Sequence, residues 1–170
     1  MGGVFAFLIM FILVARITRS TVNVDHTFNA NVDKVWKLWN DPESIQKWWS
    51  PKNYTSPVVK NDFRVGGRFL MSMKSPNGEL FWNTGTYKEI DPEKMIDSTM
   101  SFSDENGKPV PGSDVKVPGI WPDEVRVTVR FKEVDGKTIV SVQEAGVPLL
   151  MNFLAKMGWE QQFEKFEALL

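Results

Sequence analysis

Hydrophobic and polar residues begin to alternate at Thr21, a pattern typical of a strand with one buried face. The residues expected to point inward are Val22, Val24, His26, Phe28 and Ala30. The pattern then changes to helical spacing, and Asn31 is a suitable cap for a short helix. Asp41 and Pro42 start a second helix, which should end before Pro51. The opening of the chain therefore predicts a strand followed by two helices.

The middle of the chain alternates in short stretches separated by turn residues. Asn77-Gly78 and Asp135-Gly136 indicate hairpins, because such pairs accept the positive φ angles that tight turns need. Gly66-Gly67 indicates another turn. The strands expected around these turns span residues 68–74, 82–90, 95–103, 125–132 and 138–143. This order predicts an antiparallel meander with one solvated face.

Residues 104–123 interrupt the meander. They contain four prolines and three glycines, so neither a helix nor a long strand is expected. A loop of this length inside a domain is often functional, for example as a lid or portal, and a disordered surface insertion is the alternative. The pair Ile120-Trp121 favours a docked loop, because a free loop gains little from an exposed indole.

After Pro148 the spacing of apolar residues is helical to the end of the sequence. The apolar positions are Leu150, Phe153, Leu154, Met157, Phe163, Phe166 and Leu170. Gly158 costs roughly 1 kcal/mol relative to alanine, so a kink or break is expected there. The whole order is strand, two helices, several strands and a final helix. It predicts an α+β domain, with an antiparallel sheet and its helices on one face.

Short motifs along residues 20–170 occur in an order that resembles the SRPBCC (START-like) superfamily. The branch they resemble is the domain family named after the activator of Hsp90 ATPase homologue 1. The motifs are Asn31 to Trp36, Asp41-Pro42-Glu43, Gln46 to Pro51, Asp62 to Phe69, Pro76-Asn77-Gly78, Gly85-Thr86-Tyr87, Gly136-Lys137-Thr138 and Gly158-Trp159.

The resemblance implies a helix-grip (START/Bet v 1-like) fold, in which a curved antiparallel sheet wraps a long carboxy-terminal helix and encloses a cavity. It does not imply a single activity, since the superfamily includes carriers of lipids and small hydrophobic molecules, cyclases, ring-hydroxylase components and a co-chaperone domain. The eukaryotic co-chaperone has a separate amino-terminal domain that engages the chaperone. Here only about twenty residues precede the matching region, which argues against Hsp90 activation.

The chain has 170 residues and a formal net charge of −1, which suits one domain with its own core. Thirteen of its first fifteen residues are hydrophobic and none is charged. This run is shorter than the roughly 20 residues of a membrane-spanning helix. It is interpreted as an atypical signal or anchor, as a locally packed extension, or as a start site assigned too far upstream.

We therefore divide the chain into a hydrophobic extension, residues 1–19, and a domain, residues 20–170. A cytoplasmic location is expected for the domain. If the extension is genuine, membrane association through residues 4–15 is expected instead.

The composition excludes several kinds of chemistry. Twenty basic and 21 acidic residues without a basic run give no footprint for nucleic acid. The absence of cysteine excludes thiolate zinc sites, iron–sulfur clusters and cysteine nucleophiles, and a single histidine excludes a multi-histidine metal site within one chain. No phosphate loop or nucleophile elbow occurs. We accordingly predict no catalytic residue, no metal site and no cofactor.

His26 is the one side chain that ordinarily titrates near neutral pH. It should point inward, either as a buried histidine with a hydrogen-bond partner or as a ligand anchor or general acid–base group. Glu144 is a candidate partner.

Large apolar side chains provide the candidate lining of a cavity. Methionine adapts to different apolar ligands, and ligand pockets are mostly apolar with a few polar groups, although core packing is the alternative for each position. Only one of Trp48 and Trp49 should face the core, because they are adjacent on a helix. The candidate lining residues are His26, Trp48, Phe69, Met71, Met73, Trp82, Met100, Phe102, Trp121, Phe153 and Met157.

The sequence thus predicts the non-catalytic binding of a small hydrophobic molecule, with residues 104–123 gating the cavity. A first alternative is a protein-interaction domain of co-chaperone type, in which side chains fill the cavity and exposed aromatic residues contact a protein partner. A weaker alternative is a cyclase- or hydrolase-like enzyme that uses His26.

Overall fold

The structure is a computed structural model that describes Met10, Val14 and residues 18–170. The predictions about the hydrophobic run in residues 1–19 fall almost entirely outside these residues. Among the residues that the structure describes, no helix is long and apolar enough to cross a membrane.

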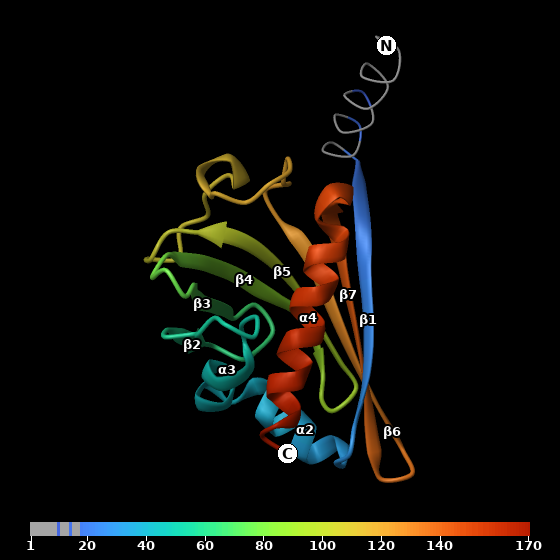
Figure 1. Ribbon diagram of the computed structural model, residues 1–170. Helices are drawn as coiled ribbons and strands as arrows, with labels where there is room; N and C mark the ends of the chain where they lie inside the picture. The colour runs from blue at the N-terminus through green and yellow to red at the C-terminus, as the bar shows by residue number, and fades with distance from the viewer. Residues whose placement is uncertain (1–9, 11–13, 15–17) are drawn as a thin grey trace.

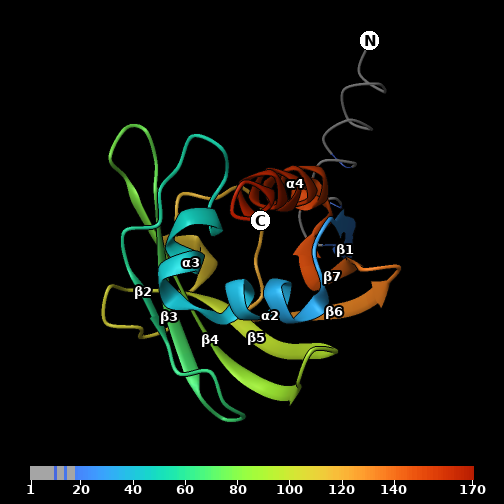
Figure 2. The same cartoon turned by 90° about the horizontal axis from the view of Figure 1, so that it is seen from below.

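One antiparallel sheet of seven strands forms the body of the molecule, in the order β1-β7-β6-β5-β4-β3-β2. Figures 1 and 2 show that this sheet curves around the carboxy-terminal helix α4, with α2 and α3 near one end of that helix. The strands are β1 (Arg19–Phe28), β2 (Val59–Asn61), β3 (Arg68–Lys74), β4 (Leu80–Asp91), β5 (Met95–Ser103), β6 (Val125–Val134) and β7 (Lys137–Pro148). The helices are α2 (Val32–Asn40), α3 (Pro42–Trp48) and α4 (Asn152–Glu167), with 3-10 turns η1 (Gly112–Asp114) and η2 (Leu149–Met151). The α+β helix-grip prediction is confirmed.

Local sequence signals set the boundaries of these elements. The side chain of Asn31 accepts a hydrogen bond from the Lys34 backbone N–H at 3.1 Å, which caps α2. Asp41 caps α3 in the same way, with Pro42 in the first turn. In the hairpin between β6 and β7, Asp135 and Gly136 both have positive φ, 51° and 72°, as a tight turn of this kind requires.

Trp48 and Trp49 correct one expectation, because both are buried, with exposed fractions of 2% and 8%. Helix α3 ends at Trp48, and Trp49 takes a non-helical conformation with φ −73° and ψ 70°. The helical geometry that would separate the two rings on adjacent positions therefore no longer applies. The rings meet edge to face, with centroids 5.7 Å apart.

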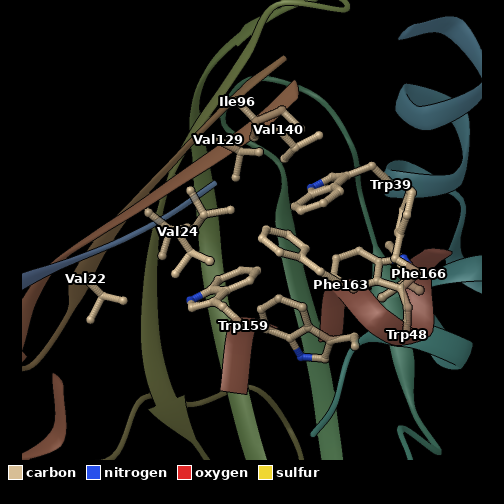
Figure 3. Packing of buried hydrophobic residues seen from close by; sticks show 14 of the residues in the cluster. Val22, Val24, Trp39, Trp48, Ile96, Val129, Val140, Trp159, Phe163 and Phe166 are labelled. Atoms are coloured by element: carbon tan, nitrogen blue, oxygen red, sulfur yellow. The ribbon is translucent and has the colours of Figure 1, made fainter. Parts of the chain in front are cut away.

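Helix α4 is unbroken from Asn152 to Glu167, so the kink expected at Gly158 does not occur. The reason is tertiary packing, which outweighs the low helix propensity of one glycine. Trp159, Phe163 and Phe166 anchor the helix to the sheet and to the rings of Trp39 and Trp48, as Figure 3 shows.

Residues 104–123 are docked on the domain, as the Ile120-Trp121 pair predicted. The indole of Trp121 packs edge to face on Phe102, with centroids 5.2 Å apart, and its Nε1 donates to the Pro118 carbonyl. The backbone N–H of Val110 also donates to the carbonyl of Phe102. The loop thereby forms a wall at one end of the sheet.

Candidate functional site

A cavity of about 520 Å³ lies between the sheet and the amino-terminal half of α4, and it is open to solvent. Strands β3 to β7 contribute to its walls, together with residues 49–54, the docked loop and α4. Its lining includes Trp49, Tyr54, Met73, Phe81, Asn83, Met100, Phe102, Lys116, Val117, Trp121, Val125, Glu144, Met151, Leu154, Ala155, Met157, Gly158, Trp159 and Gln162. Most of this surface is apolar.

The cavity arises from an uneven distribution of side-chain volume along α4. Toward its carboxyl end, Phe163 and Phe166 fill the space against the sheet and the α2–α3 segment. Toward its amino end, the lining positions include the small residues Ala155 and Gly158. A methyl group placed on Gly158 would meet no heavy atom within 4 Å, so this glycine borders open space. The small side chains at these two positions add to the space between the helix and the sheet.

The structure brings most of the predicted lining residues together. Met73, Met100, Phe102, Trp121 and Met157 line the main cavity. Three more, Trp48, Phe69 and Met71, line a smaller inner cavity of about 50 Å³. Met100, Trp49 and Trp159 border both spaces, so the inner cavity adjoins the main one.

His26 does not line either cavity, which corrects that part of the prediction. It lies on the inward face of β1, as its strand position predicted, but packs near the carboxyl end of α4. Its ring centroid is 4.5 Å from that of Phe28 and 5.4 Å from that of Phe163, and its Nε2 is 3.6 Å from the Glu167 carboxylate. This end of the helix is filled by aromatic side chains.

Trp82 and Phe153 also lie outside both linings. Trp82 alternates along β4 with Phe81 and Asn83, which line the cavity, so its own side chain belongs to the opposite face of the sheet. Phe153 is 70% exposed, because the first turn of α4 presents it to solvent.

Glu144 is the functional candidate whose position the sequence left open. It lies on β7 between Val22 of β1 and Val127 of β6, on the inward face, and is only 5% exposed. The Trp159 Nε1–H donates to its Oε2 at 2.9 Å. Burial raises the pKa of the Glu144 carboxyl above its ordinary value, although the hydrogen bond from Trp159 opposes this.

The suggested pairing of Glu144 with His26 does not occur. On β7, His26 stands opposite Val140, four residues from Glu144. Four residues of strand correspond to roughly 13 Å, well beyond a hydrogen bond. His26 and Glu144 both point to the inward face of the sheet, but they lie at different positions along their strands and therefore do not meet.

Other polar atoms border the cavity without forming hydrogen bonds inside the described part of the chain. The indole Nε1 of Trp49 and the Oε1 of Gln162 are buried and have no partner there. Gln162 lies three residues after Trp159, on the same side of α4. No group of three or more His, Asp or Glu side chains among the described residues is arranged to hold a metal ion.

Known proteins share this architecture. A family model described as "Activator of Hsp90 ATPase homolog 1-like protein" matches residues 29–170. A crystal structure of a protein from Chromobacterium violaceum is 22% identical, with a TM-score of 0.73 over 89% of this chain and 97% of that chain. One from Mycobacterium smegmatis is 24% identical, with a TM-score of 0.71 over 88% and 90%. The solution structure of an AHSA1-like protein from Aeromonas hydrophila is 20% identical, with a TM-score of 0.62 over 88% and 90%. These identities establish a common fold, and no curated protein matches the chain.

Proposed function

This chain belongs to the activator of Hsp90 ATPase homolog 1-like family, and we propose that it binds a small hydrophobic molecule between its sheet and α4, without catalysis. The observation that carries the proposal is the apolar cavity of about 520 Å³. Sites for small molecules are concave, mostly apolar and roughly 300–1,000 Å³ in volume, with a few polar groups that orient the ligand. The cavity fits each part of this description, with Glu144 as its buried polar group.

The open cavity favours this function over a protein-interaction domain of co-chaperone type. That alternative assumed a filled interior and an exposed aromatic surface. The two adjacent tryptophans Trp48 and Trp49 are instead buried, and Trp121 packs against Phe102 at the cavity wall.

The positions of the polar groups favour binding over acid–base catalysis. General acid–base chemistry needs groups within hydrogen-bond reach of one reacting atom. Glu144 contacts Trp159 at the cavity, while His26 lies beside Glu167 near the other end of α4. The two titratable groups therefore do not converge on one point.

We propose that the ligand enters the cavity beside the docked loop, residues 104–123. Lys116, Val117 and Trp121 of the loop line the cavity together with Leu154 of α4. Movement of the loop would widen the opening without disturbing the strands below it.

Native mass spectrometry tests the proposed function. The full chain, purified without detergent, is incubated with a panel of fatty alcohols, fatty acids and polycyclic aromatic compounds, and thermal unfolding is followed in parallel. We expect a one-to-one complex with at least one compound and a higher midpoint temperature for that complex, because ligand binding stabilises the native state. No complex and no shift with any compound would overturn the proposal, and a stoichiometric protein partner found together with that result would support the interaction alternative.

A further inference from the structure

Glu144 is a buried acid whose hydrogen bonding is incomplete. The one hydrogen bond that the described residues provide to its carboxyl comes from Trp159 and reaches Oε2. The second oxygen, Oε1, has no partner among these residues, and Glu144 belongs to the cavity lining. Oε1 is not among the buried side-chain atoms that lack a hydrogen-bond partner, so it is accessible, and because Glu144 lines the cavity a molecule bound there can reach it.

Asp97 shows how the same protein compensates a buried acid that has no access to the cavity. Arg126 donates to both of its carboxylate oxygens, at 2.8 and 3.0 Å, and the Thr128 hydroxyl donates at 2.8 Å. Burial acts to raise the pKa of Asp97, but these hydrogen bonds and the charge of Arg126 outweigh it and the pKa is lowered. Glu144 has no such cation among the described residues, and its second oxygen is left accessible at the cavity wall, where a ligand can bind to it.

The charge around Glu144 limits what that partner can be. From the neighbouring strands it faces Val22 and Val127, and from α4 it faces Trp159. Lys116 is the one other charged residue of the cavity lining, and its ammonium group is highly exposed and paired with Glu79 at 3.4 Å. An anionic ligand would place a second acid beside Glu144 without a buried cation. A cationic ligand would require an ion pair in an apolar space, with a desolvation cost that is seldom recovered.

We propose that the cavity selects uncharged amphiphiles whose hydroxyl group hydrogen-bonds to Glu144, while their apolar body lies beneath Ala155 and Gly158. A hydroxyl both donates and accepts, so it can hydrogen-bond to the Glu144 carboxyl in either protonation state. Gln162, with its unpartnered Oε1 three residues from Trp159, supplies a further acceptor at the same side of the helix. This inference rests on the proposed function and assigns the chemical class of its ligand.

Three ligands with the same alkyl chain test the selection: 1-decanol, decanoate and decylamine. Each displaces the neutral fluorescent probe N-phenyl-1-naphthylamine from the full chain at pH 7. We expect decanol to bind at least tenfold more tightly than either ion, which corresponds to about 1.4 kcal/mol. Decanoate or decylamine binding as tightly as decanol would overturn the selection rule, whereas failure of the probe and of all three ligands to bind would overturn the proposed function itself.

Two variants connect the selection to Glu144. Glu144→Gln keeps a donor and an acceptor, so the affinity for decanol should stay within about threefold of the wild-type value. A threefold change is smaller than the change expected from the loss of one hydrogen bond. Glu144→Leu should weaken decanol at least fivefold and leave the probe bound, which also shows that the cavity is intact. If the Leu variant does not fold, the relative affinities of the three ligands for the wild type test the proposal without it. Unchanged decanol affinity in a folded Leu variant would overturn the role of Glu144.

A different observation carries a second proposal, which concerns the outer surface at the same end of α4. Five large apolar side chains there are between 43% and 70% exposed: Ile120, Leu149, Leu150, Phe153 and Leu154. Four of them lie in η2 and the first turn of α4. Ile120 joins them because the neighbouring Gly119 lies against Pro148 and Met151. We call these five residues the apolar rim.

The apolar rim lies beside the cavity and beside the start of β1. Leu154 belongs to both the rim and the cavity lining. The backbone N–H of Leu149 donates to the Thr18 carbonyl at 2.8 Å, and the side chain of Arg19 donates to the Ile120 carbonyl. Figure 1 shows this end of α4 next to the start of β1. Residues 18 and 19, where the continuously described part of the chain begins, therefore lie next to the rim, and the uncharged run of residues 2–15 precedes them in the sequence.

We propose that the apolar rim docks on a lipid bilayer, so that the cavity opens toward the membrane surface. Large exposed apolar side chains bind at the interface between head groups and acyl chains, and a second apolar segment nearby adds to the affinity. The uncharged run that precedes the domain in the sequence favours a bilayer over a protein surface, because an apolar segment of this kind adds to membrane affinity.

Vesicle flotation tests this second proposal. The full chain is mixed with vesicles of phosphatidylcholine that contain about one fifth phosphatidylglycerol. Phe153→Ser/Leu154→Ser should reduce the floating fraction at least fivefold, and both positions are exposed, so folding should be preserved. The matched control is Val65→Ser/Leu80→Ser, two similarly exposed apolar residues away from the rim, which should float like the wild type. Equal flotation of all three proteins, or no flotation of the wild type, would overturn the proposal. A wild type that does not float but forms a dimer, which the double variant does not form, would assign the rim to a protein contact and would also overturn it.

Discussion

At the scale of single residues, the contact between Trp159 and Glu144 joins α4 to β7, the strand next to the edge of the sheet. The indole satisfies one carboxyl oxygen, but indole is neutral and cannot balance a negative charge as Arg126 does for Asp97. The uncharged carboxyl is therefore the form that the cavity wall stabilises, and the ionised form is a source of instability.

This difference predicts how stability depends on pH. The pKa of Glu144 is raised in the folded state, so between the unfolded and folded pKa values the native protein binds more protons than the unfolded chain. Its contribution to the free energy of unfolding is complete below the ordinary glutamate pKa and is lost as the pH rises through the folded value. Glu144→Gln should remove this loss, so that the variant gains a few degrees on the wild type between pH 4 and pH 8.

Thermal unfolding of the two proteins across this pH range measures the effect. Because all other titrating groups are shared, the difference in midpoint temperature between wild type and variant isolates Glu144. A difference that stays constant with pH would show that the pKa of Glu144 is not raised by burial.

At the scale of elements, α4 performs two tasks with its two halves. Its carboxyl-terminal half anchors the helix through Phe163 and Phe166, and its amino-terminal half borders the cavity through Ala155 and Gly158. Anchoring at one end allows the other end to stand over an unfilled space. The low helix propensity of Gly158 is the stability cost of that arrangement.

Gly158→Ala should therefore stabilise the protein by about 0.5–1 kcal/mol, the usual difference between glycine and alanine inside a helix. The added methyl group meets no heavy atom within 4 Å, so no clash offsets the gain. Urea unfolding of both proteins gives the difference directly. A destabilised variant would indicate that the space beneath Gly158 is smaller than the structure shows.

The same elements show what the sequence could predict. The caps of α2 and α3 and the Asp135-Gly136 hairpin depend on a few neighbouring residues, so their patterns identified them correctly. The burial of Trp49 could not be predicted, because it depends on whether α3 ends at residue 48 or at residue 49. Since α3 ends at Trp48, Trp49 leaves the helical conformation and its ring can point into the core.

The candidate site was less predictable because it depends on contacts between distant elements. Met71 and Met73 of β3 were identified from alternation within their own strand, and Met100 of β5 was identified only as a large apolar residue on or near the sheet. Glu144 required the parity of β7 and the position of Trp159 together. The inward orientation of His26 was predicted correctly, but its position beside the carboxyl end of α4 was not. Periodicity shows which face of a strand a residue occupies, and it does not show which part of another element packs against that residue. The small residues Ala155 and Gly158 were the available signal for the cavity, because a packed helix rarely turns two small positions toward its sheet.

At the scale of the whole molecule, the curved sheet, the docked loop and α4 together enclose the space that the proposed function needs. No one element contains the site: the lining comes from five strands, α4, the turn η2 and two connecting segments. Substitution of one lining residue should therefore leave the fold in place, while a large side chain in the centre should exclude a ligand.

The most direct test of the central claim is the binding of N-phenyl-1-naphthylamine to the wild type, Gly158→Ala and Gly158→Phe. Fluorescence titration should show saturable one-to-one binding by the wild type and by Gly158→Ala. Gly158→Phe should bind at least tenfold more weakly, because its ring occupies the cavity, while its circular dichroism spectrum matches that of the other two proteins. Equal binding by all three folded proteins, or no saturable binding by the wild type, would contradict a ligand site beneath α4.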